Sequence, residues 1–405
     1  MNRFLFCAAL TALVIALSIL FQKPITYNNG LGWDGSQYAE LTAQCWREPL
    51  NAREPFAYRI GAPCLAALVP LAPRLGLWTV NVAASVLLLF LVDAWVRRHV
   101  SSTIAPWLLA GFAFHWVAPL RQVWWYPTYI DPGALCAMVG ALLMAHRRIP
   151  FALICFGGSL IRETTLIVPL ALMFGARVRQ RDSRSPTSAG SASTDFINAT
   201  LGLVTSLAGI GLTHLIATPS SDYWFADAAF YWAYSKPLPT YLLAIFIAFG
   251  PAVSLLAVGW GAVKTHLSQF PDHAVMLVSA VILAGIGGSD TERFLMWSSP
   301  IVLVLIGKAA ETVDWSGAKA AAALLFTGQI VSGRWLLTIP PDFVEAPPRA
   351  WPILTPWSAE SYLQLFSQTP DRLMSAVALA QYVAVSFVLV VAFAWQRRSR
   401  STALA

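Results

Sequence analysis

Long apolar runs separated by short polar connections dominate this chain. The first run covers residues 4–21 and is followed by Gln22, Lys23 and Pro24. An α-helix crosses the hydrocarbon core of a bilayer with about 20 predominantly apolar residues, and this run is close to that length. Because no small-x-small cleavage site precedes Gln22, we interpret the run as a retained first helix rather than as a signal peptide.

Further apolar runs bring the expected number of membrane crossings to about twelve. The two runs that flank Arg162 and Glu163 are short. They predict a broken helical hairpin inside the protein, where irregular backbone is tolerated at membrane depth. The expected fold class is all-α, a polytopic transmembrane helical bundle with no sizeable soluble domain. The further runs lie at residues 75–96, 103–118, 131–145, 151–161, 164–176, 196–217, 240–263, 274–288, 294–307, 318–337 and 374–395.

The composition agrees with a membrane protein. Apolar and aromatic residues make up 57% of the 405 residues, and charged residues only 12%, whereas a soluble domain carries about 25% charged residues. This composition excludes an intrinsically disordered chain. The five cysteines are too few and too scattered for a disulfide-framed secreted fold.

The distribution of charge predicts an orientation. The net charge is +7, but the basic residues fall in short connections that alternate onto the side of Arg3. This is the positive-inside pattern rather than a phosphate-tracking patch, so no nucleic-acid partner is expected. We expect one transmembrane domain over residues 1–405 in a bacterial inner membrane, with both termini cytoplasmic. The Ser/Arg-rich stretch at about 177–194 is expected to be a mobile cytoplasmic loop.

The connections on the opposite side carry most of the acidic residues. The first of them contains Trp33-Asp34-Gly35, Tyr38 and, later, Arg59. Asp34 lies in the connection that follows the first apolar run and is therefore expected near the membrane surface. Glycine lets a ligand approach the backbone closely, and Trp and Tyr offer flat faces at headgroup depth. The alternative is an interfacial turn in which Asp34 caps a helix.

This combination resembles a known enzyme superfamily. A first apolar helix followed by Trp33-Asp34-Gly35 and Tyr38, and then by Arg59 and a proline four residues later, resembles the bacterial membrane glycosyltransferases of the GT-C superfamily. The PIG-V-like mannosyltransferases share a related Trp-Asp motif. In such enzymes an acidic residue of the first extracytoplasmic loop is the catalytic base, and the resemblance assigns that position to Asp34.

Two later features extend the resemblance. The superfamily has an Arg-Glu pair at a broken helix and an acidic cluster with arginine in a late outer loop. These are matched by Arg162-Glu163 and by Asp290, Glu292 and Arg293. The resemblance implies an inverting glycosyltransferase that uses a lipid-linked sugar donor and a glycan, lipid or protein acceptor, surrounded by membrane lipids. Each motif is short, so the resemblance depends on the placement of all of them on the same expected side of the membrane.

The chemistry of such a transfer accounts for these residue types. An acceptor hydroxyl loses its proton as it attacks the anomeric carbon, and the Asp34 carboxylate can take it. The leaving polyprenyl phosphate needs cationic donors, and the arginine fork engages two phosphate oxygens. Candidate phosphate ligands are Arg293, Arg162 and Arg59. Supporting residues are Trp33, Tyr38, Glu163, Asp290, Glu292 and Asp131.

Simpler interpretations of the same residues stay open. Arg162-Glu163 and the cluster of Asp290, Glu292 and Arg293 can pair internally as structural ion pairs. Asp131 precedes a proline and opens a predicted helix, so helix capping is its favoured role. Cys45 and Cys64 can form a disulfide if their loop faces an oxidising compartment. No metal or other cofactor is indicated, although a divalent cation held by Asp34 with Asp290 or Glu292 is an alternative.

Two other function classes remain. A secondary transporter suits about twelve helices, but transporters usually carry broken helices in corresponding positions of two related halves. The sequence predicts one broken hairpin, at Arg162, and no counterpart in the second half. A polymerase or ligase of surface polysaccharide would share the outer arginines but would not need the Trp33-Asp34-Gly35 loop.

Overall fold

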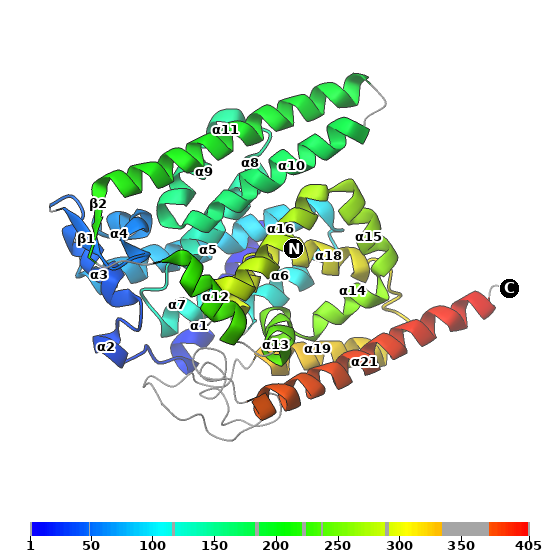
Figure 1. Cartoon of the computed structure of the whole chain (residues 1–405). Helices are drawn as coiled ribbons and strands as arrows, with labels where there is room; N and C mark the ends of the chain where they lie inside the picture. The colour runs from blue at the N-terminus through cyan, green and yellow to red at the C-terminus, as the bar shows by residue number, and fades with distance from the viewer. Residues whose placement is uncertain are drawn as a thin grey trace.

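The fold is almost entirely helical, as predicted. A computed structural model describes residues 2–47, 49–115, 118–182, 186–220, 224–235, 238–287, 291–333 and 372–403. Helices account for nearly all the regular structure of these residues, and one short two-stranded sheet accompanies them. In Figure 1 helices α9, α10 and α11 lie together along one side of the bundle, while α19 and α21 lie along the opposite side. Their bounds are Arg148–Ile161, Ile167–Asp182, Pro186–Ile216, Lys319–Gly333 and Arg372–Ala403.

Four helices are long and apolar enough to cross a membrane. They are α1 (Arg3–Phe21), α5 (Pro73–His99) and the apolar parts of α11 and α21. Two bent pairs raise the number to six if each pair is one span, with bends of 105° and 106°. The first pair joins α13 (Leu238–Phe249) to η3 (Pro251–Ser254) and α14 (Leu255–Val258), and the second joins α15 (Trp260–Gln269) to α16 (Pro271–Ile286).

The expected twelve crossings are therefore not found among the described residues. Several apolar runs form helices of only 9 to 14 residues, namely α6 (Ala105–Ala113), α8 (Asp131–Met144), α9 and α18 (Ser299–Ala310). A 14-residue helix is about 21 Å long, shorter than a hydrocarbon core of about 30 Å. Helix α18 shows the physical reason, because Ile301 and Val304 have no exposed surface and its other sides are also buried. An apolar run of this kind belongs to a protein core.

Contacts between helix ends define two ends of the bundle. Arg3 forms an ion pair with Asp93 in the last turns of α5, so α1 and α5 are antiparallel. This end also carries Arg97 and Arg98 of α5, Arg179 of α10 and Lys308 of α18, and we call it the basic face. The opposite end contains residues 22–72, and we call it the loop face.

The connection over residues 22–72 folds into a compact layer on the loop face. It contains α2 (Tyr27–Gly30), α3 (Gly35–Gln44), β1 (Leu50–Ala52), η1 (Phe56–Tyr58) and α4 (Gly61–Ala66). Strand β1 pairs in parallel with β2 (Ala217–Pro219), which directly follows α11. A disulfide joins Cys45 to Cys64, with Cα atoms 5.3 Å apart. The pairing that the sequence left open is therefore present.

The basic stretch at 177–194 differs from the expected loop. Helix α10 continues to Asp182 and α11 begins at Pro186, so most of the stretch is helical. Arg and Gln within residues 177–181 favour helix, and Pro186 is well suited to a first helical turn. The Ser-, Thr- and Gly-rich part that follows Pro186 has low helix propensity, and it forms the beginning of the long helix α11.

Candidate functional site

Asp131 is the centre of a buried ion-pair cluster. Its side chain is 1% exposed, and its Oδ1 accepts a hydrogen bond from Nη1 of Arg162. Its Oδ2 accepts from Nη2 of Arg293 at 3.2 Å and from Nε at 3.3 Å. The expected helix-capping role is wrong, because Ile130 occupies the N-cap position of α8 and Asp131 is the first residue of the helix. We call Asp131, Arg162 and Arg293 the Asp131 cluster.

Aromatic rings support both arginines of the Asp131 cluster. The Arg162 guanidinium lies 4.8 Å from the ring centre of Trp297, and the Arg293 guanidinium lies 4.7 Å from that of Tyr129. Arg162 adopts extended backbone between α9 and η2 (Glu163–Leu166), so the helix break predicted there is confirmed. Arg293 belongs to α17 (Thr291–Met296) and keeps 23% side-chain exposure. Cation–π contacts of this kind fix the planes of the guanidinium groups.

The Asp131 cluster is recessed from the end of the longest helix beside it. Asn81 of α5 donates a hydrogen bond to the carbonyl of Pro127, at 2.9 Å, just before α8 begins. Asn81 lies about 12 Å along α5 from its first residue, Pro73, at 1.5 Å per residue. At the other end of α8, Arg98 of α5 donates to the carbonyl of Leu143 at 3.0 Å. The two helices therefore run side by side in the same direction, and α8 starts below the loop-face end of α5.

The Asp34 turn lies on the segment that precedes α8. The Asp34 N–H donates a hydrogen bond to the Tyr126 hydroxyl oxygen at 2.8 Å. Gly32 has a φ of +72°, and a Cβ at this position would overlap the Tyr126 ring. A Cβ at Gly35 would overlap the side chain of Thr128, whose hydroxyl donates to the carbonyl of Leu31 at 2.8 Å. The two glycines therefore permit close packing against residues 126–128.

Aromatic rings connect the Asp34 turn to the Asp131 cluster. Trp33 packs at 5.9 Å, centre to centre, against Trp125 and also against Tyr126. Tyr126 in turn stacks on Tyr129 at 6.3 Å, and Tyr129 lies under Arg293. Burial raises the pKa of the Tyr126 hydroxyl well above its usual value, and the negative charge of Asp34 adds to this rise. The Asp34 backbone and the Arg293 guanidinium thus contact the same tyrosine pair.

Arg59 has a different partner from the other two arginines. Its Nε and Nη2 donate to the two carboxylate oxygens of Glu163 at 3.0 Å and 2.5 Å. Its Nη1 donates to the Tyr38 hydroxyl at 3.4 Å. Although partial desolvation opposes it, the Arg59 guanidinium lowers the pKa of the Glu163 carboxyl to about 2. This fork-to-carboxylate pair fastens residues 22–72 to η2, and we call it the Arg59 clamp.

The internal pairing considered for Arg162-Glu163 is therefore wrong. Each of the two residues pairs with a segment far away in the chain, Arg162 with Asp131 and Glu163 with Arg59. Glu292 of α17 is 4% exposed and adjoins Arg293. Asp290 lies outside the described residues. Within the part of the chain that the structure describes, no three His, Cys, Asp or Glu side chains lie close enough together to hold a metal ion.

Three residues of the site were not selected from the sequence. The roles of Tyr126, Tyr129 and Trp297 depend on contacts between distant segments. The only local cue was the aromatic density just before Asp131. In comparisons with known proteins, no family model, no curated protein and no solved structure matches this chain.

Proposed function

We propose that the chain is a multi-pass membrane protein whose basic face is cytoplasmic. The four to six apolar helices support insertion in a membrane. The cations at the ends of α5, α10 and α18 support the orientation, because cytoplasmic connections carry an excess of Lys and Arg. The Cys45–Cys64 disulfide belongs to the loop face, and disulfides form in oxidising compartments outside the cytoplasm.

We propose that the protein is an inverting glycosyltransferase that acts on the loop face. It moves a sugar from a polyprenyl-phosphate donor to an acceptor hydroxyl of a glycan, lipid or protein. The observation that carries this proposal is the meeting of Arg162 and Arg293 on one buried carboxylate, next to the tyrosine pair that contacts the Asp34 turn. Paired arginines can stabilise the charge of a phosphate leaving group, and a separate carboxylate on the adjoining turn can act as the base.

In the proposed reaction the acceptor oxygen attacks the anomeric carbon from the side opposite the phosphate. Asp34 takes the proton of the acceptor hydroxyl as the new carbon–oxygen bond forms. The bond between the anomeric carbon and the phosphate oxygen breaks, and its electron pair leaves with the phosphate. Arg293 and Arg162 stabilise the negative charge that develops there. One displacement inverts the anomeric configuration.

Arg162 offers a specific indication of a missing anionic partner. Its side chain is 7% exposed, and its Nε is buried without a hydrogen-bond partner among the described residues. A buried donor without an acceptor is costly and calls for an explanation. Phosphate oxygens are among the acceptors whose geometry matches an arginine fork, and the proposed donor supplies them. Arg59, by contrast, is committed to Glu163, so we assign it to positioning the loop rather than to binding phosphate.

The test is a transfer assay on purified protein reconstituted in vesicles with radiolabelled polyprenyl-phosphate sugars. Asp34→Asn keeps the size of the side chain but removes the base, so transfer should fall by about 10²-fold or more. Glu40→Gln is the matched control, because Glu40 is an exposed carboxylate on α3, the helix that begins directly after Asp34, and should leave transfer unchanged. Equal turnover of the wild type and Asp34→Asn would refute the assignment.

A secondary transporter is the second candidate, and one observation favours it. The sequence predicted no broken helix in the second half of the chain, yet two bent pairs occur there. The first bends at Gly250, which has a φ of +66°. Broken helices in both halves are a feature of transporters. Accumulation of a solute in sealed vesicles without release of polyprenyl phosphate would favour this candidate.

A further inference from the structure

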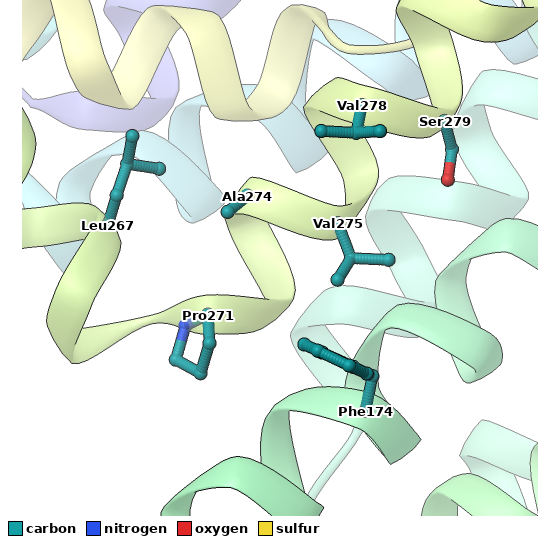
Figure 2. A pocket seen from close by; sticks show the side chains of 7 residues that line it. All are labelled: Phe174, Leu267, Pro271, Ala274, Val275, Val278 and Ser279. Carbon is teal, nitrogen blue, oxygen red and sulfur yellow. The ribbon is translucent and has the colours of Figure 1, made fainter.

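An apolar groove opens on the outer surface of the bundle near the basic face. It lies between Phe174 of α10, Leu267 of α15 and one side of α16 that includes Val275 and Val278 (Figure 2). Six of its seven lining residues are apolar, with Ser279 as the exception, and its volume is about 280 Å³. Phe174 and Val278 are 52% and 58% exposed, so the groove is accessible from outside the protein.

Helix α15, which forms one wall of the groove, has both of its ends on the basic face. A Cβ at Gly259, just before α15, would overlap Ala309 at the end of α18. The His266 ring near the other end packs 5.6 Å from the ring of His99, the last residue of α5. The bend of 106° then turns the chain into α16. Helix α15 therefore runs along the basic face, and the groove occupies the corner between this face and α16.

Two walls of the groove carry a cation about one helical turn away from a lining residue. Lys264 precedes Leu267 by three residues on α15, and Arg177 follows Phe174 by three residues on α10. Residues three apart share one side of a helix. Both cations are exposed, and neither forms an ion pair with a residue that the structure describes. The neighbouring Arg179 differs, because it donates to Asp272 at 2.8 Å.

We propose that this groove and its two cations form a binding site for an anionic phospholipid of the leaflet on the basic side. An acyl chain lies in the groove, and the headgroup phosphate lies between Lys264 and Arg177. Basic pockets between transmembrane helices on the cytoplasmic side are suited to anionic headgroups. The volume of the groove, about 280 Å³, is slightly below that of ordinary ligand pockets, which begin at about 300 Å³. The groove therefore holds part of one acyl chain rather than a whole lipid.

The two exposed cations, Lys264 and Arg177, together with the apolar groove favour an anionic phospholipid over other ligands. A zwitterionic lipid would fill the groove equally well but would gain less from two exposed cations close to its phosphate. A soluble anion would use the cations but would leave the apolar surface of α10 and α16 uncovered. The site shares no residue with the Asp131 cluster, and it depends on insertion in a membrane but not on the proposed transfer reaction.

Native mass spectrometry of the full-length protein in detergent tests the site. Phosphatidylglycerol and phosphatidylcholine with identical acyl chains are added at equal concentrations. The wild type should retain the anionic lipid preferentially, and the double variant Lys264→Gln with Arg177→Gln should lower that preference by about 25-fold, near fivefold for each cation. Lys319→Gln is the matched control, because Lys319 is an exposed lysine at the start of α19.

A second variant separates the groove from the cations. Val275→Phe fills the groove without changing charge and should lower retention of both lipids, with elution from size exclusion as the check on folding. The double variant changes only exposed side chains, so it gives a result even if Val275→Phe fails to fold. Equal retention of the two lipids by the wild type, or an unchanged preference in the double variant, would overturn the proposal.

Discussion

The Asp131 cluster and the Arg59 clamp are two arginine–carboxylate groups with opposite designs. In the first, a carboxylate with 1% exposure holds two arginines at the start of a recessed helix. In the second, one arginine grips both oxygens of Glu163, whose side chain is 46% exposed. The clamp satisfies its own charges and fastens a loop. The Asp131 cluster gathers positive charge on one anion and leaves a buried donor, Nε of Arg162, available.

This difference separates a structural ion pair from a candidate ligand site. A paired and half-exposed carboxylate needs no further partner. Two cations around one buried carboxylate are expensive to maintain, and such groups persist where they serve a function. The predictions below are ordered by expected effect, and each one tests a different side of this comparison.

The largest effect is expected from Asp131→Ala. Removal of the carboxylate leaves Arg162 and Arg293 without their shared counter-ion, and breaking a buried pair in this way costs about 3–5 kcal/mol. The yield of folded protein and the midpoint of thermal unfolding in detergent should both fall. Glu163→Gln should lower the same midpoint much less. A similar loss in both variants would contradict the distinction between the two groups.

The next effect is expected from the disulfide of the loop face. Replacement of Cys45 and Cys64 by serine frees a loop of about 20 residues, and closing a loop of this size contributes about 3 kcal/mol. Arg59 lies inside that loop, so limited proteolysis should cut residues 22–72 faster in the variant. Alkylation after rapid trapping from cells should find both thiols oxidised in the wild type. Free thiols there would contradict the proposed orientation of the loop face.

Arg293→Lys tests the Asp131 cluster as a phosphate site. Lysine keeps the charge but lacks the two-pronged fork, so donor use should weaken by about 1.5–3 kcal/mol in kcat/KM, while folding stays nearly unchanged. Arg59→Lys offers the comparison, because the clamp is assigned to positioning and should affect loop stability more than donor affinity. Full donor affinity in a well-folded Arg293→Lys protein would rule out the fork-to-phosphate assignment.

The smallest effect is the pH dependence of the Arg59 clamp. The pKa of Glu163 is lowered to about 2, below its value of about 4.3 in an unfolded chain. The stabilisation is therefore fully present above about pH 4.3 and is lost as pH falls towards 2. Because the side chain is 46% exposed, solvent screening limits this contribution to about 0–1 kcal/mol. Glu163→Gln should remove the acid-dependent part of loop protection in hydrogen exchange.

The sequence predicted the long helices well and their number poorly. Runs such as 4–21 and 75–96 are uniform and long, and they form α1 and α5 almost as expected. The shorter runs were counted as crossings because hydropathy does not distinguish lipid from protein interior as surroundings. Helix α18, buried on all sides, is the clearest case.

The candidate site was predicted in its residue types but not in its pairings. Arg162, Glu163 and Arg293 were singled out as costly charges in an apolar chain, and all three are indeed held by ion pairs. Their partners come from segments far away in the sequence, which no local pattern reveals. Asp131 was assigned to a helix cap because Asp-Pro at a helix start is a common local signal. In the structure the Asp131 carboxylate instead forms ion pairs with Arg162 and Arg293.

The measurement that most directly tests the central claim is donor binding and transfer on the same preparation of Asp34→Asn. If Asp34 is the base and the Asp131 cluster holds the donor phosphate, Asp34→Asn should bind a radiolabelled polyprenyl-phosphate sugar with wild-type affinity while transfer falls by about 10²-fold or more. Transfer at the wild-type rate, or loss of donor binding together with transfer, would contradict the separation of base and phosphate site.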